Sequence, residues 1–310
     1  MEVSVLIIVK NENAIRRTLD ALSKQIQTDE QECLVIDASN PPLSSLEQDY
    51  PWITLHKFPL VEGRTITIPH QRNFAVKKAS GRCILFCDAG GIPCEDWIIE
   101  LSTPLLTGQF DLVGGPIESI NKWAPYKIQN LQKWGDRLKI SSSANLGFTS
   151  AVYKMLEGFE EGLDYGSDAE FIWRASKIGI KHSAVPSALM QLDGGSLTRE
   201  LKRSWLYGKA IVDLLRLHSN QIRPKMIESP EMFIYPILIV VWLFLIPISC
   251  YLNFQLILLN FFVALHFIII LKNFKSKRPL FSLLLNYLHG LGSLYRLFMI
   301  ITPRSGDNEH

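Results

Sequence analysis

Strands and helices alternate along the first 115 residues, and this rhythm restricts the fold more than any other feature of the chain. Short apolar runs predict strands at residues 3–9, 32–37, 53–56, 83–87 and 111–115. Amphipathic stretches between them predict helices at residues 12–25, 70–79 and 96–106. Because parallel strands need crossover helices, we expect an α/β fold with a mostly parallel sheet and helices on both faces.

The second part of the chain is less regular. A strand is predicted at residues 144–149, a helix at 168–177, short strands at 181–185 and 188–192, and an amphipathic helix at 197–218. We therefore divide the chain into four parts. They are a catalytic-type domain (1–195), a membrane-proximal helix and linker (196–229), a membrane region (230–303) and a short tail (304–310).

Composition excludes some classes of function. The 310 residues carry a formal net charge of +2, which gives no signature of nucleic-acid binding. Met1 leads directly into an apolar strand without a basic segment, so we expect no signal peptide. The five cysteines lack metal-ligand spacing, and we interpret them as small buried residues of a reducing compartment.

Residues 232–271 contain no Lys, Arg, Asp or Glu, which predicts two transmembrane helices, 232–249 and 252–271. Basic residues flank this stretch on both sides, so the positive-inside rule predicts a hairpin with both ends in the cytoplasm. Residues 279–301 are also apolar but include Arg296. We favour a helix in the membrane interface there, with a third span as the alternative.

Polar residues follow three of the predicted strands directly. Lys10, Asn11 and Glu12 come after the first strand, Asp37 ends the second, and Asp88 follows Cys83–Cys87. The carboxyl ends of parallel strands meet at one edge of the sheet, where open α/β sheets bind ligands. We therefore expect these side chains to surround one ligand.

Four blocks in order resemble family 2 glycosyltransferases, over residues 3–195. The blocks are VSVLIIVKNENAIRRTLDAL, ECLVIDASN, RNFAVKKASGRCILFCDAG and GFEEGLDYGSDAEFIWRASKIGI. The resemblance implies a GT-A-like fold that binds a nucleotide-diphospho-sugar. The "DAG" variant with an apolar C-terminal region is similar to members linked to exopolysaccharide or lipid-linked saccharide assembly.

The resemblance also implies a set of nucleotide-binding residues. They are Lys10, Asn11, Glu12, Asp37, Arg72 and Asn73. Arginine can fork onto phosphate oxygens, which suits Arg72. Structural alternatives stay open: a helix cap for Asn11 and Glu12, a turn for Asp37, and a surface arginine at position 72.

Asp88 is the metal ligand that the resemblance implies, for Mg²⁺ or Mn²⁺. Gly90 stands where the family's "DxD" motif has its second acid. These cations often take only one or two carboxylates besides substrate phosphates, so a single acid is sufficient in principle. Asp193 is a possible second ligand, with a turn before Gly194 as the alternative.

Asp168 is the candidate general base, since an inverting transfer needs a carboxylate that accepts the proton of the acceptor hydroxyl. The family's "ED" pair reads Ser167-Asp168 in this chain, so the Glu is lost. The alternative is a capping box in which Ser167 caps a helix and Glu170 closes the box.

The sequence thus predicts a membrane-anchored, inverting glycosyltransferase with a lipid-linked acceptor at the cytoplasmic membrane face. One alternative is a polyprenyl-phosphate sugar transferase, in which the phosphate itself attacks. Another is a catalytically silent nucleotide-binding or scaffold member of a polysaccharide assembly complex, which Gly90 and Ser167 favour. The donor nucleotide, the sugar, the acceptor and the oligomeric state are not indicated by the sequence.

Overall fold

The computed structural model describes most of the N-terminal two thirds of the chain and one C-terminal helix. The described residues are 1–26, 29–59, 66–120, 128–129, 132–134, 138–140, 142–193, 196–219, 279–302 and scattered positions between 237 and 266. The chain divides into two compact units, the first made of residues 1–121 and 127–193, the second of residues 122–126 and 194–310.

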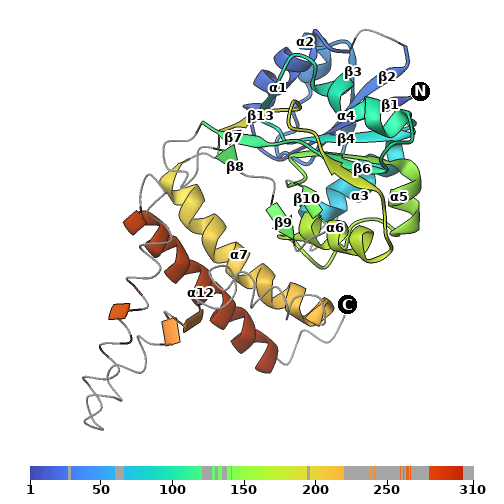
Figure 1. Cartoon of the computed structure of the whole chain (residues 1–310). Coiled ribbons are helices and arrows are strands. Elements are labelled where there is room, and N and C mark those ends of the chain that lie inside the picture. The colour runs from blue at the N-terminus through green and yellow to red at the C-terminus, as the bar shows by residue number, and fades with distance from the viewer. Residues whose placement is uncertain are drawn as a thin grey trace. The chain divides into compact units, whose positions relative to one another are not determined.

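A seven-stranded sheet forms the centre of the first unit (Figure 1). Its order is β12 (His182–Ala184), β6 (Leu112–Gly114), β11 (Asn145–Thr149), β4 (Cys83–Cys87), β1 (Val3–Val9), β2 (Gln31–Asp37) and β3 (Ile53–Lys57). Four of the six pairings are parallel, and β11 is antiparallel to both β4 and β6. The predicted α/β fold with a mostly parallel sheet is confirmed.

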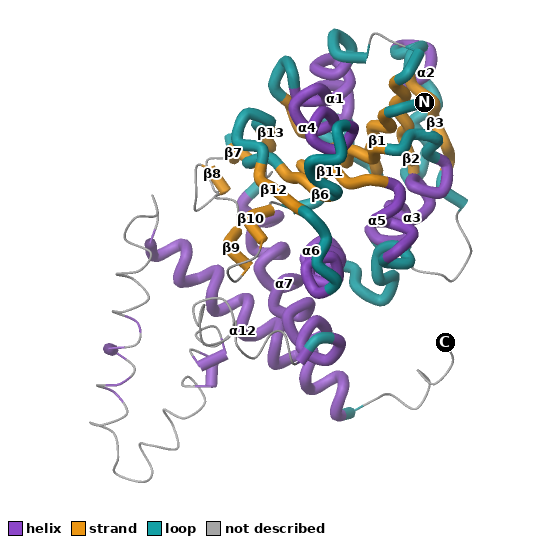
Figure 2. The backbone as a smooth tube through the Cα atoms, turned by 45° about the vertical axis from the view of Figure 1, so that its right-hand side comes forward, coloured by secondary structure: helices purple, strands orange, loops and turns teal. Residues whose placement is uncertain are grey.

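Helices cover both faces of this sheet, as Figures 1 and 2 show. The helices of the first unit are α1 (Ile15–Leu22), α2 (Leu46–Asp49), α3 (Ile68–Lys78), α4 (Trp97–Leu106), α5 (Ser150–Met155) and α6 (Ser167–Lys177). Alternate residues of each strand point to opposite faces. The fold therefore has two separate hydrophobic cores.

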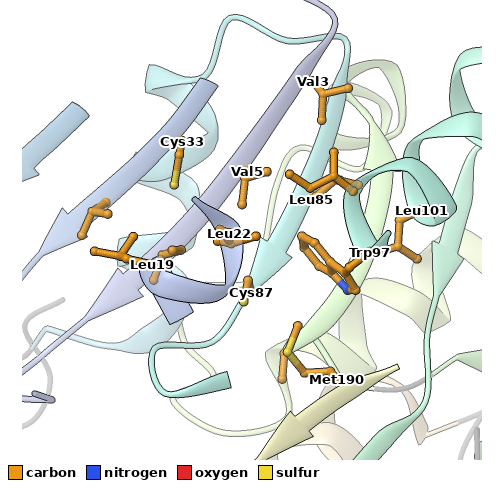
Figure 3. Close-up of a cluster of buried hydrophobic side chains, with 14 of the residues drawn as sticks. Val3, Val5, Leu19, Leu22, Cys33, Leu85, Cys87, Trp97, Leu101 and Met190 are labelled. Carbon is orange, nitrogen blue, oxygen red and sulfur yellow. The ribbon is translucent and has the colours of Figure 1, made fainter. Parts of the chain in front are cut away.

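The first core lies under α1, α2 and α4 and takes Val3, Val5 and Leu85 from the sheet (Figure 3). Trp97 is fully buried there, and its indole nitrogen donates to Asn145 Oδ1 at 2.8 Å. The second core lies under α3, α5 and α6. It is rich in aromatic rings, with the Phe159 and Phe171 centroids 4.4 Å apart.

A smaller four-stranded sheet has the order β5 (Gly91–Pro93), β13 (Met190–Leu192), β7 (Ile117–Ser119) and β8 (Ile128–Gln129). Short strands β9 (Gln132–Trp134) and β10 (Leu138–Ile140) form a hairpin. The strand rhythm did not predict β5 or β7, because three-residue strands leave no clear alternation of apolar and polar residues. They matter because β5 pairs with β13 beside Asp88.

Helix boundaries are set by local chemistry that partly escaped prediction. Helix α3 begins at Ile68, two residues before the predicted start, because the Thr67 side chain caps it and Pro69 occupies its first turn. Helix α1 begins at Ile15, later than the predicted residue 12. Asn11 has a φ of 54°, a left-handed conformation that does not continue into a helix.

The second unit contains two long helices, α7 (Leu197–Leu217) and α12 (Pro279–Ile301), which pack against each other (Figure 1). A Cβ on Gly208 would lie 1.9 Å from the carbonyl oxygen of His289, so the backbones touch where they cross. The Ser293 hydroxyl donates to the Gly208 carbonyl at 2.8 Å, and Arg296 pairs with Asp213. Small and polar residues therefore contribute to this contact, together with the rings of Trp205 and Tyr295, whose centroids lie 5.4 Å apart.

The predicted spans 232–249 and 252–271 lie almost wholly outside the described residues. Within the part of the chain that the structure describes, no helix combines the length and apolar character needed to cross a bilayer. Residues 279–301 form one helix with the predicted boundaries.

Candidate active site

The loops that follow β1 and β2 are tied together at the carboxyl edge of the sheet. The backbone N–H of Asn11 donates to Ser39 Oγ at 2.8 Å, and the N–H of Asn40 donates to Asn11 Oδ1 at 3.0 Å. Lys10 and Asn11 are exposed and Glu12 is half-buried. Asn11 and Glu12 make no side-chain cap on α1, which begins beyond them. Glu12 Oε1 accepts from the N–H of Ala14 at 3.3 Å. The ligand-binding role of Lys10, Asn11 and Glu12 stays a prediction.

Asp37 stabilises the loop that follows β2, which is the turn role given above as the alternative to nucleotide binding. Its side chain is buried, and its carboxylate accepts N–H bonds from Ser39 at 2.8 Å and Leu43 at 2.6 Å. The turn alternative thus describes the observed contacts. Asp37 shapes the loop that carries Ser39 and Asn40.

Arg72 is buried rather than exposed, and its guanidinium binds groups of the protein. It donates to Ser167 Oγ at 3.0 Å and to Ser143 Oγ, and it lies over the Phe159 ring at 5.6 Å. The surface-arginine alternative is therefore wrong. The guanidinium groups NH1 and NH2 each donate to one serine hydroxyl, and the predicted fork onto phosphate stays a prediction.

Asn73 fastens the loop between α5 and α6. Its amide nitrogen donates to Phe159 O and Glu161 Oε1, both at 2.9 Å. Its oxygen accepts from Phe159 N at 2.9 Å and from the Tyr153 hydroxyl at 3.1 Å. All hydrogen-bonding positions of this amide are filled. Asn73 therefore holds a loop in this structure, and its predicted contact with a nucleotide stays a prediction.

Burial raises the pKa of Tyr153 to about 12, with a smaller contribution from the nearby Glu161 carboxylate. Its hydroxyl is therefore protonated at neutral pH and can donate to Asn73. The loop that Asn73 and Tyr153 hold includes Gly158, whose φ is +86°. This loop carries the Phe159 ring to Arg72.

Asp88 follows β4 directly and is half-buried, at the place the sequence predicted. The chain turns sharply after it, with Gly91 N donating to Asp88 O at 2.9 Å. Gly90 forms the turn with a φ of +91°, and its N–H donates to Thr18 Oγ1. A Cβ on Gly90 would lie 3.2 Å from the Ala14 Cβ. This turn thus directs a side chain at position 90 toward residue 14.

Asp193 follows β13, and strand pairing places it beside the Asp88 turn. In the antiparallel pairing, Leu192 lies opposite Gly91, so the next residue continues toward Gly90. Asp193 is exposed. The register therefore supports the prediction that Asp193 could supply the carboxylate missing at position 90.

The donor chemistry at this turn suits a divalent cation. Mg²⁺ and Mn²⁺ prefer oxygen ligands and commonly combine one or two carboxylates with substrate phosphates. Asp88 offers one carboxylate, and Asp193 a second. Among the described residues there is no group of three or more His, Cys, Asp or Glu side chains placed to hold a metal. A cation here would thus depend on oxygens of the substrate.

Asp168 lies in the first turn of α6, and its carboxylate is held at both oxygens. Oδ1 accepts from Ala169 N at 2.9 Å, and Oδ2 accepts from Ser143 N at 3.2 Å and Ser143 Oγ at 3.3 Å. The side chain is half-buried. The N-terminal turn of a helix is a favourable position for an acidic side chain.

The capping-box alternative for this helix is wrong. The N-cap is Gly166 with a φ of +82°, and no side chain caps it. Ser167 accepts from Arg72 instead, and Glu170 forms an ion pair with Arg174 at 2.6 Å.

Strand pairing brings Asp168 to the same edge as Asp88. In the antiparallel pair of β11 and β4, Asn145 lies opposite Cys87, so residue 144 continues toward Asp88. Ser143 precedes it and bonds Asp168. The metal-ligand candidate and the base candidate thus lie near one strand end, from segments 80 residues apart.

Ser143 and Phe159 were missed as parts of the site. Ser143 belongs to a Ser triplet at 141–143, a polar cluster directly before a strand, and this position was the available signal. Phe159 gives no such signal, because an aromatic residue in a loop is most often part of a core.

Comparison with known proteins gives one family match. Residues 4–157 match the model of Glycosyl transferase family 2. No curated protein matches the sequence.

Solved structures share the fold at low identity. S. aureus TarS 1–349 is 19% identical with a TM-score of 0.53, over 69% of this chain and 66% of that chain, just under two thirds. The same fragment in complex with UDP-GlcNAc has a TM-score of 0.54 at 19% identity, over 69% of this chain and 67% of that chain. Mannosyltransferase PcManGT from Pyrobaculum calidifontis, in complex with GDP-Man and Mn²⁺, has a TM-score of 0.66 at 15% identity, over 96% of this chain and 87% of that chain.

These likenesses establish the fold. The family match covers β1 to β11 and includes Asp88 and Gly90, while Asp168 and Asp193 lie beyond its end. The chain has the GT-A fold, and its residues 4–157 form the part that matches Glycosyl transferase family 2.

Proposed function

We propose that the chain transfers a sugar, with inversion, from a nucleotide-diphospho-sugar to a membrane-associated, lipid-linked acceptor. The observation that carries this proposal is Asp168, a carboxylate held at both oxygens at the sheet edge where Asp88 follows β4. An inverting transfer uses one carboxylate as general base, positioned for the attacking hydroxyl. Asp168 takes this role.

The donor binds at the edge that Lys10, Asn11, Glu12 and Asp88 border. Lys10 supplies an exposed positive charge for a phosphate, and Asn11 and Glu12 offer polar groups to the base or ribose. Support comes from the neighbours of similar fold, which were solved with UDP-GlcNAc or GDP-Man. Asp37 orders the adjoining loop.

Asp88 and Asp193 would hold a divalent cation together with the donor's phosphates. When bound, the cation supplies positive charge to the diphosphate leaving group. One of the solved neighbours contains Mn²⁺ together with GDP-Man. The test compares Mn²⁺ with EDTA in Asp88→Ala, Asp193→Ala and the unchanged chain.

Release of nucleoside diphosphate tests the reaction itself. Membrane-extracted protein is given UDP-, GDP- and dTDP-sugars with a lipid extract. We expect release from one donor class, dependent on the extract and on Asp88. Nucleotide binding without release from any donor would contradict the proposal and favour the catalytically silent alternative.

Membrane association is the second part of the proposal, with the catalytic unit on the cytoplasmic side. The uncharged residues 232–271 support it, and so does the polarity of α12. Its buried residues include Ser282 and Ser293, whereas Leu280, Phe298 and Ile301 are 71%, 63% and 76% exposed. Helices that meet through small and polar residues and expose apolar ones are typical of a lipid environment.

Flotation with vesicles containing anionic lipid tests this part. Removing Phe298 from lipid costs roughly 1.5–3 kcal/mol, so Phe298→Glu should weaken binding about tenfold or more. Ile99→Glu is the matched control, since Ile99 is 60% exposed in the first unit. Equal flotation of both variants would contradict a role of α12 in lipid binding.

A further inference from the structure

Ser143 forms a directed link between Arg72 and the proposed base. A guanidinium can only donate hydrogen bonds, so the Ser143 hydroxyl must accept from Arg72. The single hydroxyl proton is then left for Asp168 Oδ2, which lies 3.3 Å away. The N–H of Ser143 donates to the same oxygen at 3.2 Å. Both donors of one residue therefore point to one oxygen of the base.

Arg72 places a buried positive charge behind this link. The residue is only 6% exposed, and within the described residues it forms no ion pair. Its partners are the Ser143 and Ser167 hydroxyls and the face of the Phe159 ring. A buried charge is costly unless other groups compensate it. The hydrogen-bonded route from Arg72 through Ser143 leads to the carboxylate of Asp168.

The surroundings fix Arg72 in this place. The Phe159 ring lies 5.6 Å from its guanidinium and stacks on Phe171. Asn73, the next residue along α3, bonds both backbone groups of Phe159. The consecutive residues Arg72 and Asn73 thus both contact the loop that carries Phe159, and Arg72 also binds Ser143 just before β11. Because Arg72 is held by these contacts, it can fix the orientation of the Ser143 hydroxyl.

Asp168 gains a defined orientation from these contacts. Ala169 N holds Oδ1 and Ser143 holds Oδ2, while the side chain stays partly exposed. Small errors in the placement of a catalytic group cost large factors in rate, up to about 10²-fold for 1 Å. Groups that fix a base therefore contribute to turnover without touching the substrate.

We propose that Ser143 and Arg72 are positioning residues, which orient the Asp168 carboxylate through a directed hydrogen-bond chain. This inference rests on the proposed function, in which Asp168 is the base. It assigns Arg72 to the carboxylate in place of the donor phosphates, and it adds Ser143 to the site.

The test uses the full chain and measures kcat, KM for the donor and the pH–rate profile. Ser143→Ala should lower kcat by about 10- to 100-fold and change KM by less than about twofold. Ser143→Thr keeps the hydroxyl and should recover most of the loss. Ser167→Ala is the matched control, because it removes the other serine partner of Arg72 and leaves the bonds to Asp168. Its loss should be several-fold smaller.

Variants of Arg72 separate positioning from a general effect on folding. Arg72→Gln removes the guanidinium that binds the Ser143 hydroxyl, so kcat should fall about as far as in Ser143→Ala, with the donor KM unchanged. Arg72→Lys keeps a cationic donor and should recover part of this loss. Thermal unfolding of each variant shows whether it is folded, and the pH–rate profile ensures that kcat is compared at the pH optimum of each variant.

Two results distinguish failure of this inference from failure of the proposed function. A folded Ser143→Ala variant with unchanged kcat and pH profile, in a chain that needs Asp168, would overturn the positioning role alone. A Ser143→Ala variant whose loss of activity appears as a higher donor KM would also overturn the positioning role. That result would favour a contact between Arg72 and the donor phosphates. Absence of turnover by the unchanged chain, or its persistence in Asp168→Asn, would overturn the proposed base and this inference with it.

Discussion

Gly90 explains at the level of one residue why the second acid of the motif is absent. Its φ of +91° is a conformation that residues with a Cβ rarely adopt, and the Cβ would meet Ala14 at 3.2 Å. The N–H of Gly90 is also committed to Thr18. An Asp at this position would be strained and directed at α1. The turn in this chain therefore does not readily accept the second acid of the motif at position 90.

Gly90→Asp should destabilise the chain and should not increase its affinity for Mn²⁺. Left-handed strain costs roughly 1–2 kcal/mol, and the contact with Ala14 adds to it. The control is Gly108→Asp, because Gly108 has a φ of +70° with nothing within 4 Å of a Cβ. Chemical unfolding should show the larger loss for Gly90→Asp. Equal losses, or tighter Mn²⁺ binding, would contradict this interpretation of the turn.

The cysteine thiols form a second residue-scale case. Burial raises the pKa of Cys83 to about 11 and the pKa of Cys87 well above its ordinary value, and Cys33 is shifted in the same direction. Their thiols stay protonated at neutral pH, so they react slowly, because the thiolate is the nucleophile. Cys94 is only half-buried.

In a Cys250→Ser background, Cys94 should therefore be the single thiol of the native protein that reacts with a disulfide reagent at pH 7.5. The remaining three should react only after unfolding. Mass spectrometry of the labelled peptides identifies the site. Rapid labelling of Cys87 would show that the strand leading to Asp88 is accessible to solvent, against the structure.

At the scale of elements, the loop between α5 and α6 joins two parts of the candidate site. It is held by Asn73 from α3 and by Arg174 from α6, which donates to the carbonyls of Leu156 and Gly158. Phe159 in this loop contacts Arg72. The loop therefore connects α3 with α6, and Asp168 lies in the first turn of α6.

Asn73→Ala should cost about 2–4 kcal/mol of stability, because it removes four hydrogen bonds and leaves buried partners unsatisfied. Activity should fall as well, since the position of Arg72 depends on Phe159. Asn13→Ala, at an exposed position, should stay within about 0.5 kcal/mol of the unchanged chain. Urea unfolding measures both. A cost below about 1 kcal/mol for Asn73→Ala would show that the loop does not depend on this amide.

At the scale of the whole molecule, the sequence predicts the alternating strands and helices of the first 115 residues well. It predicts the short strands and the strand order poorly. The strands at residues 3–9 and 83–87 have the predicted boundaries because they are buried on both faces and form continuous apolar runs. The antiparallel position of β11 was not predictable, since no local pattern encodes strand order. Yet this strand brings Ser143 and Asp168 to the edge near Asp88.

The site was predictable where a residue's position follows from its own strand, and not where partners come from elsewhere. Asp88 and Asp168 lie as expected, at a strand end and in the first turn of a helix. Arg72 and Asn73 were assigned to a ligand because their partners, Ser143 and Phe159, are about 70 and 86 residues away. The sequence shows which hydrogen-bond donors a side chain carries, whereas the acceptors that they bind depend on the fold.

The most direct test of the central claim is turnover by Asp168→Asn beside the control Asp164→Asn, with the donor and lipid extract that support release. Asp164 is exposed and lies in the segment that precedes α6. We predict that Asp168→Asn lowers kcat by about 10²- to 10⁴-fold with donor binding retained, and that Asp164→Asn is unchanged. If Asp168→Asn instead keeps turnover within a few-fold of the unchanged chain, Asp168 is not the base, and a reaction in which a phosphate acceptor itself attacks becomes the better description.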